Sequence, residues 1–153
     1  MKILVFAALL LAALIYFRPH QGYSLSDSAS EEAKIIRIAR EGMPEIVLQK
    51  SEKGWEITRP VKGMASPDKV ANVLSLLKAR SGNRLEAREI SRFGLEKPVL
   101  RISIDSEEFD FGMLNPVTGQ QYVAKGNAVY LISAKYALVP SLSELEEDHA
   151  GAS

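Results

Sequence analysis

Apolar and polar residues alternate along much of the chain after residue 33, which is the pattern of strands that bury one face. The first three alternating segments are 34–40, 46–50 and 55–59. Trp55 and Ile57 fall on the same face of the third segment, and Pro60 ends it because proline cannot donate to a strand ladder. The pattern therefore predicts three short strands joined by turns.

The spacing changes to that of a helix over residues 66–80. Ser66 is a suitable N-cap, and Pro67 is well placed as the first helical residue. The apolar residues then recur on one helical face, at Val70, Val73, Leu74 and Leu77. We expect Gly82 to end the helix in a left-handed conformation. A helix with one apolar stripe is expected to pack on the sheet.

The second half of the chain returns to alternation, with expected strands at 100–105, 109–113, 121–125 and 129–132. Gly126 and Asn127 form a two-residue hairpin signal between the last two. Residues 84–90 fit either a strand or a short helix, and 92–98 reads as a turn. A short final helix is expected over 136–145, interrupted or started by Pro140.

These elements predict the fold class α+β. We expect antiparallel sheet meanders with one amphipathic helix packed on the sheet and a short C-terminal helix, all preceded by an N-terminal transmembrane helix. The expected shared core consists of Trp55, Leu74, Leu77, Ile102, Phe109 and Phe111. Trp55 is interpreted as a core residue rather than an exposed stacking residue. Tyr122 and Tyr130 are expected to form a cross-strand pair, with a binding surface as the second interpretation.

The chain begins with an uncharged apolar run from Ile3 to Phe17, preceded by Lys2. The run favours an uncleaved membrane anchor over residues 1–20, because the bulky residues after Phe17 do not suit a signal-peptidase site. A cleaved signal sequence is the alternative, with the small residues 28–30 as a distant cleavage site. We expect a single-pass protein of the cell inner membrane with its C-terminal domain in the periplasm or otherwise outside the cytoplasm.

Composition divides the rest of the chain into three parts. Residues 21–33 are serine-rich and polar, which predicts a flexible linker. Residues 34–146 carry the alternating and helical patterns and are expected to form a single α+β domain. Residues 147–153 are expected to be a disordered tail.

The residue types present exclude much familiar chemistry. The chain has no cysteine, so disulfides, thiol catalysis and thiolate metal sites are excluded. Its two histidines, His20 and His149, both lie outside the expected domain. We therefore expect no catalytic, cofactor-binding or metal-binding residues and no cofactor. Nineteen basic and nineteen acidic residues give zero net charge, which argues against a nucleic-acid partner.

Two charged clusters remain as candidates for binding. Residues 105–110 are the densest acidic segment, and a calcium site or paired carboxylates are possible there. The cluster lacks EF-hand spacing, so a solvated hairpin turn is favoured. Basic residues recur every fourth position at Arg80, Arg84, Arg88 and Arg92. On one helix they would form a phosphate or lipid-headgroup contact, but a solvated face with salt pairs is favoured because Gly82 interrupts it.

Three motifs occur in a fixed order: a tryptophan-to-proline strand at 54–60, an aromatic-Gly-Leu-x-x-Pro turn at 93–98, and the aromatic-Gly pair Phe111 and Gly112. In order and spacing, residues 34–145 resemble the bacterial domain of unknown function 4340. The resemblance implies a membrane-tethered exported protein, since members of that family look like such proteins and some look associated with gliding-type ABC transporter components. It supplies no catalytic residues.

Three functional hypotheses follow. The first is a non-enzymatic membrane-anchored module, attached through Ile3 to Phe17, that contacts an envelope or membrane protein partner. Such a module would be a protein-interaction or assembly component of an envelope or transporter-associated complex. The second is a small domain that binds a peptide, glycan or lipid on the sheet face. The third, least favoured, is a hydrolase that uses a pair of Asp or Glu residues.

Overall fold

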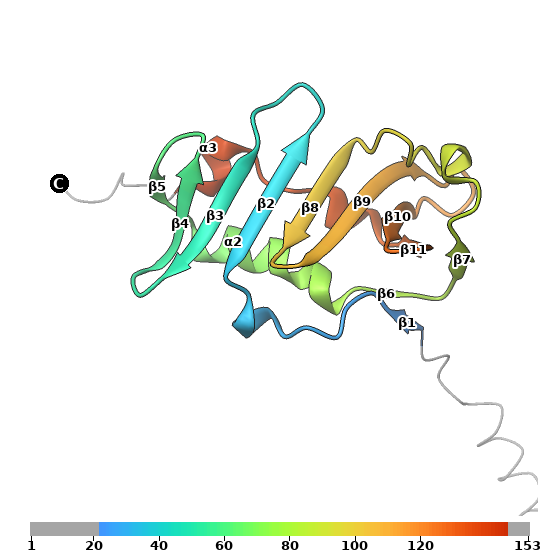
Figure 1. Cartoon of the computed structure of the whole chain (residues 1–153), viewed down its shortest axis with the longest axis horizontal. Helices are drawn as coiled ribbons and strands as arrows, with labels where there is room; N and C mark the ends of the chain where they lie inside the picture. Colours follow the sequence, from blue (N-terminus) through green and yellow to red (C-terminus); the bar gives the residue numbers. More distant parts are fainter. Residues whose placement is uncertain (1–21, 147–153) are drawn as a thin grey trace, which may run out of the picture.

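The alternating segments and the helix assemble into the structure shown in Figure 1, a computed structural model that describes residues 22–146. In chain order the elements are β1 (Tyr23–Ser24), η1 (Ser30–Glu32), β2 (Ile35–Arg40), β3 (Ile46–Ser51), β4 (Gly54–Arg59), β5 (Gly63–Met64), α2 (Pro67–Leu74), η2 (Ser75–Lys78), β6 (Arg80–Ser81), β7 (Arg84–Glu86), η3 (Ile90–Phe93), β8 (Leu100–Ile104), β9 (Glu107–Leu114), β10 (Gln121–Lys125), β11 (Ala128–Ile132), η4 (Ala134–Ala137) and α3 (Leu142–Leu145), where η marks a 3-10 helix.

Most strands of residues 22–146 belong to one antiparallel sheet in the order β5-β4-β3-β2-β8-β9-β10-β11-β7. Two meanders, β2 to β5 and β8 to β11, meet where β2 pairs with β8. In that central pair Ile36 lies opposite Ile104 and Ile38 lies opposite Ile102, so these four isoleucines lie on the same face. The expected antiparallel sheet with a helix and a short C-terminal helix is therefore confirmed for the described residues.

Helix α2 and the turn η2 cover one face of this sheet (Figure 1). The buried core contains five of the six residues expected to share it, namely Leu74, Leu77, Ile102, Phe109 and Phe111. Trp55, the sixth, is half-buried and packs against this core. The expectation of one shared core is confirmed, because each side chain lies on the apolar face of its element.

The helix is shorter than the expected 66–80. It changes to 3-10 geometry at Ser75, and η2 then buries Leu76 and Leu77. The apolar pairs 73–74 and 76–77 are three residues apart, and a 3-10 turn places such residues directly above one another. Gly82 does not adopt the expected left-handed conformation. The chain instead becomes extended at Ala79 and enters β6, which pairs with β1.

Two further expectations are corrected in detail. The ambiguous segment 84–90 begins as strand β7, which pairs with β11, and ends where η3 starts. The final helix expected over 136–145 is divided into η4 and α3, separated by Pro140. Proline cannot continue the helix, and α3 restarts with Ser141 and Glu144 in a capping box.

Residues 22–33, the described part of the flexible linker expected over 21–33, are packed along the domain, and we refer to them as the strap. Leu25 is only 3% exposed, and its amide donates to the carbonyl of Ala79 at 3.2 Å. Ala33 is also buried at the other end of the strap. In Figure 1 the strap passes beneath the start of β2 and reaches β1 beside β6. The flexible linker was predicted from polar composition, but a single buried leucine and a short strand pair are enough to dock this segment on the domain.

The expected anchor, residues 1–20, and the expected tail, residues 147–153, lie outside the described residues. Within residues 22–146, no helix has both the length and the apolar character needed to cross a bilayer.

Candidate functional site

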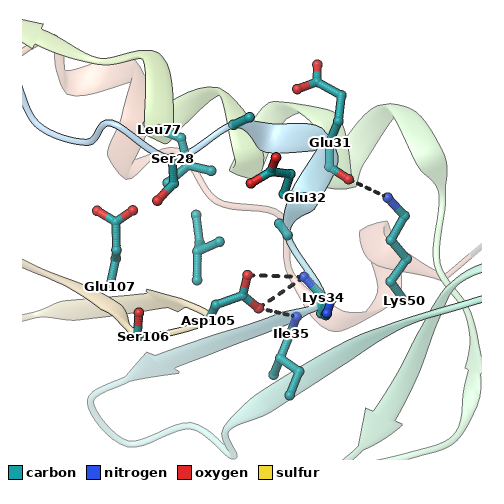
Figure 2. A pocket seen from close by; sticks show the side chains of 13 residues that line it. Ser28, Glu31, Glu32, Lys34, Ile35, Lys50, Leu77, Asp105, Ser106 and Glu107 are labelled. Carbon is teal, nitrogen blue, oxygen red and sulfur yellow. Dashed lines mark hydrogen bonds between the residues drawn. The ribbon is translucent and has the colours of Figure 1, made fainter.

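A hollow lined by charged residues lies between the strap and the end of the sheet where β8 turns into β9 (Figure 2). Its volume is about 790 Å³. Its lining includes the acidic residues Glu31, Asp105 and Glu107 and the basic residues Lys34 and Lys50. Both signs of charge therefore face the same space.

Asp105 holds the start of β2 in place. It occupies the turn between β8 and β9 with a φ of 51°, in the left-handed region that aspartate tolerates better than most residues. Its carboxylate accepts hydrogen bonds from the backbone amides of Lys34 at 3.0 Å and Ile35 at 2.8 Å (Figure 2). Its own amide donates to the carbonyl of Ile35 at 2.9 Å. These three hydrogen bonds give Asp105 a structural role in fixing the start of β2.

Glu107 attaches the strap to the sheet. One carboxylate oxygen accepts a hydrogen bond from the hydroxyl of Ser26 at 2.6 Å, and the other forms an ion pair with Lys125. Lys125 also donates to the carbonyl of Leu25, so the ammonium group contacts both the strap and the carboxylate. The Glu107 side chain is 16% exposed. Burial alone would raise the pKa of Glu107, but the hydrogen bonds from Lys125 and Ser26 outweigh it and hold the pKa below its ordinary value.

The acidic cluster at 105–110 is thus divided between two faces of the sheet. Asp105 holds the start of β2 and Glu107 holds the strap, whereas Glu108 and Asp110 lie on the opposite face from Glu107 and pair with Arg101. The Arg101 guanidinium contacts Asp110 in a bidentate arrangement at 2.5 and 2.9 Å. Among residues 22–146, no group of three acidic or histidine side chains is placed to hold a metal ion.

The four arginines at four-residue spacing do not share a helix. Arg80 lies in β6 and Arg84 in β7, while Arg88 and Arg92 flank the start of η3. Arg88 pairs with Glu86 at 2.5 Å and Arg92 with Glu89 at 2.7 Å, which confirms the salt-paired, exposed face for these two. Arg80 donates instead to the carbonyl of Gly22, and Arg84 donates to the hydroxyl of Tyr130 at 3.4 Å.

The expected cross-strand tyrosine pair is wrong. In the β10–β11 register Tyr122 lies opposite Leu131, and Tyr130 lies opposite Val123. Neighbouring positions on a strand point to opposite faces, so the two tyrosines lie on different sides of the sheet. Tyr122 packs instead against Phe93, with ring centroids 4.7 Å apart.

The last two sequence motifs meet in space. The turn at 93–98 lies over the strand end at Gly112, so closely that a Cβ at Gly112 would overlap the carbonyl oxygen of Phe93 and lie 3.0 Å from Cγ of Leu95. Gly94, which follows η3, has a φ of 68° and lies against Met113. Gly112 is therefore needed for the close approach of the two segments, and Gly94 is needed for the left-handed turn.

The second candidate surface has no signal in the sequence and lies at the sheet end where β2 ends and β8 begins. Seven of the ten exposed large hydrophobic residues of the described chain lie in the loops and strand ends there, and we call them the apolar rim: Met43, Val61, Val99, Met113, Leu114, Val117 and Leu138. Val117 is 90% exposed and Leu138 is 81% exposed. These residues are scattered in the sequence and lie along the same end of the sheet because antiparallel strands return alternate loops to that end.

Comparison with known proteins gives one match. No curated protein and no solved structure matches the chain. The pattern of one family, described as a domain of unknown function, matches residues 55–148, which is more than half of the chain. The match begins at Trp55, so β2 and β3 lie before it although they occupy the middle of the sheet. The chain therefore belongs to the family described as domain of unknown function DUF4340.

Proposed function

We propose that this protein is a non-enzymatic, membrane-anchored module outside the cytoplasm that binds another envelope or membrane protein through its apolar rim. The observation that carries the proposal is the concentration of exposed large hydrophobic residues at one end of the sheet. Exposed apolar groups that gather in one region are typical of interaction sites, whereas single ones are ordinary.

The membrane part of the proposal rests on the sequence before the described residues. The run from Ile3 to Phe17 contains no charged residue, and its fifteen residues, the last two of them aromatic, approach the length needed to span a bilayer. An anchor would confine the domain to two dimensions and so raise its effective concentration near a membrane partner.

The proposal is tested by photo-crosslinking in the cells that naturally make the protein. A photoreactive amino acid is placed in the full chain at Val117 or at Leu138, and a matched control is placed at Glu52, an exposed residue of the turn between β3 and β4. We expect the same crosslinked product at both rim positions, no such product at Glu52, and much weaker crosslinking when residues 1–20 are deleted.

Several outcomes would overturn the proposal. A mature protein whose N-terminus lies near Glu31 would show that the apolar run is cleaved off and is not an anchor. A C-terminal reporter active only in the cytoplasm would refute the orientation. Equal crosslinking at Glu52 and Val117 would refute the rim as the binding surface. Turnover of a substrate by the purified chain would refute the non-enzymatic role.

A small ligand-binding domain is the second candidate, and the hollow beside the strap favours it. The hollow combines Lys34 and Lys50 with several carboxylates, a lining suited to a polar ligand such as a peptide or glycan. This candidate is tested by screening such ligands for binding to the full chain. If the hollow is the binding site, Lys50→Ala weakens the binding of a ligand found in the screen and leaves the crosslinks at the apolar rim unchanged.

A further inference from the structure

The strap brings the start of the described chain close to its membrane anchor. Only residues 18–21 separate Phe17 from Gly22. An extended chain advances about 3.3–3.6 Å per residue, so Gly22 lies within about 18 Å of the end of the apolar run. A free twelve-residue linker would allow the domain to move widely, but the docked strap removes that freedom.

The strap is held at several points along its length. Tyr23 pairs with Ser81 and Ser24 pairs with Arg80 in the β1–β6 ladder. Leu25 is buried, and Ser26 contacts Glu107 as described above. Gly22 approaches β6 so closely that a Cβ there would lie 2.6 Å from the carbonyl oxygen of Ser81. The position at which the chain leaves the domain is therefore fixed beside β6.

The side chains around this position have the composition of a membrane interface. Tyr23 is 52% exposed, and Arg80 and Arg84 are also exposed. We call these three residues the exit surface. Tyrosine is enriched at the headgroup level of bilayers, and arginine binds phosphate oxygens in a bidentate arrangement.

The two arginines of the exit surface also differ from most other arginines of the domain in their partners. Five other described arginines form ion pairs with carboxylates: Arg37, Arg59, Arg88, Arg92 and Arg101. Arg40 donates to the carbonyls of Val139 and Pro140. Within residues 22–146, Arg80 and Arg84 contact only a carbonyl and a hydroxyl, so their positive charge is not neutralised by a carboxylate.

We propose that the exit surface of Tyr23, Arg80 and Arg84 rests on anionic phospholipid headgroups of the membrane that holds the anchor. This proposal depends on the anchor of the proposed function and adds an orientation to it. The strap end of the domain lies against the bilayer, and the loop between β2 and β3, part of the apolar rim, points away from it (Figure 1). Each arginine near an anionic surface contributes electrostatic attraction that decreases within a Debye length of about 8 Å.

The test uses the full chain in lipid vesicles and takes advantage of the absence of cysteine, which permits single labels. A fluorophore is attached at Asn83→Cys, next to the exit surface, or at Val117→Cys on the apolar rim. A quencher is carried by the lipid headgroups. With phosphatidylglycerol mixed into phosphatidylcholine, we expect strong quenching at position 83 and weak quenching at position 117. With phosphatidylcholine alone, quenching at position 83 is expected to fall.

Charge reversal identifies the residues responsible. Arg84→Glu is expected to lower the ratio of docked to undocked domain at least about fivefold in the phosphatidylglycerol vesicles. In vesicles of phosphatidylcholine alone, the same substitution should change this ratio little. Lys62→Glu, which changes the same charge at the other end of the sheet, is the matched control and should leave quenching unchanged. Unchanged circular dichroism of Arg84→Glu checks that the variant folds.

Three results would overturn the proposal. Equal quenching at positions 83 and 117 would refute the orientation, and equal quenching at position 83 in both lipids would refute recognition of anionic headgroups. Equal effects of Arg84→Glu and Lys62→Glu would show that net charge rather than the exit surface is sensed. Extraction of the full chain from vesicles by alkaline carbonate would instead refute the anchor itself, and the docking with it.

Discussion

At the scale of single residues, Glu107 joins the strap to the sheet. Its carboxylate is bonded to Ser26 on the strap and to Lys125 on β10, and Lys125 in turn contacts the carbonyl of Leu25. From sequence this glutamate is one of several acidic residues in a turn, and its replacement would be expected to have little effect. Its burial and its partners predict a larger effect.

We expect Glu107→Gln to lower the free energy of unfolding by about 1–3 kcal/mol at pH 7. The lowered pKa of Glu107 favours the folded state when the carboxylate is charged, so the contribution is complete above the unfolded value near pH 4.3. It is lost as the pH falls through the lower pKa of the folded state. Urea unfolding of the full chain in detergent, followed by Trp55 fluorescence, measures both effects. In Glu107→Gln the decrease in stability below about pH 4.3 should be smaller than in the wild type.

Glu108→Gln serves as the control for that measurement. Glu108 is exposed on the opposite face and pairs with Arg101 at 3.4 Å. Its replacement should change the free energy of unfolding by less than about 0.5 kcal/mol. If the two variants behaved alike, Glu107 would not hold the strap.

A second residue-scale prediction concerns Gly112. A Cβ at this position would overlap the backbone carbonyl of Phe93, and backbone cannot move aside as a flexible side chain can. Gly112→Ala is therefore expected to destabilise the protein by about 1–3 kcal/mol, as overpacking does. Gly63→Ala, where nothing lies within 4 Å of the added Cβ, should be tolerated. Thermal unfolding of both variants in detergent decides the point, and similar midpoints would contradict the close approach.

At the scale of elements, the strap is part of the domain because apolar burial and backbone pairing both hold it. Leu25 is the only leucine of the strap, and it is buried next to the end of η2. Its contribution resembles that of a core side chain, although it belongs to a serine-rich segment.

We expect Leu25→Ala to release the strap, because truncation of a buried leucine costs about 2–5 kcal/mol. Hydrogen exchange followed by mass spectrometry measures this release. Peptides covering residues 22–33 should exchange slowly in the wild type and quickly in Leu25→Ala, while peptides covering β8 and β9 should change little. Asp27→Ala, an exposed replacement in the same segment, should leave protection intact. Fast exchange in the wild type would mean that the strap is not docked.

At the scale of the whole molecule, the sheet separates the two surfaces to which we assign a role in our proposals. The strap and exit surface lie at one end, and the loop between β2 and β3 projects from the other (Figure 1). If the membrane holds the first, the rim is presented to a partner at the height of the domain above the bilayer.

This arrangement predicts the minimal folded unit. Removal of residues 1–20 should leave a folded domain with an unchanged urea midpoint, because the strap is retained. Removal of residues 1–33 should lower the midpoint clearly, because Leu25, Ser26 and Ala33 are lost together. Equal urea midpoints for the two truncations would show that the folded domain starts at residue 34, as its composition suggested.

The elements whose residues contact one another locally, or face one side in regular alternation, could be predicted from the amino-acid sequence alone. The strands around β2, β3 and β4, the strands β8 to β11, the start of α2 at Pro67 and the six-residue core were all predicted, because periods of 2.0 and 3.6 residues report which side of an element is buried. The resemblance to the family was carried by glycines and prolines, whose backbone requirements are also local. The run from Ile3 to Phe17 still carries the anchor as a prediction.

The features that depend on residues far apart in the chain became visible only in the folded protein. The docked strap depends on Glu107 and Lys125, which lie more than 80 residues further along the chain than Ser26. The faces of Tyr122 and Tyr130 depend on a register that a one-residue shift would reverse. The apolar rim and the exit surface depend on which loops an antiparallel sheet brings to the same end. Local composition cannot report these contacts, because their free energy comes from burial between segments that the sequence keeps apart.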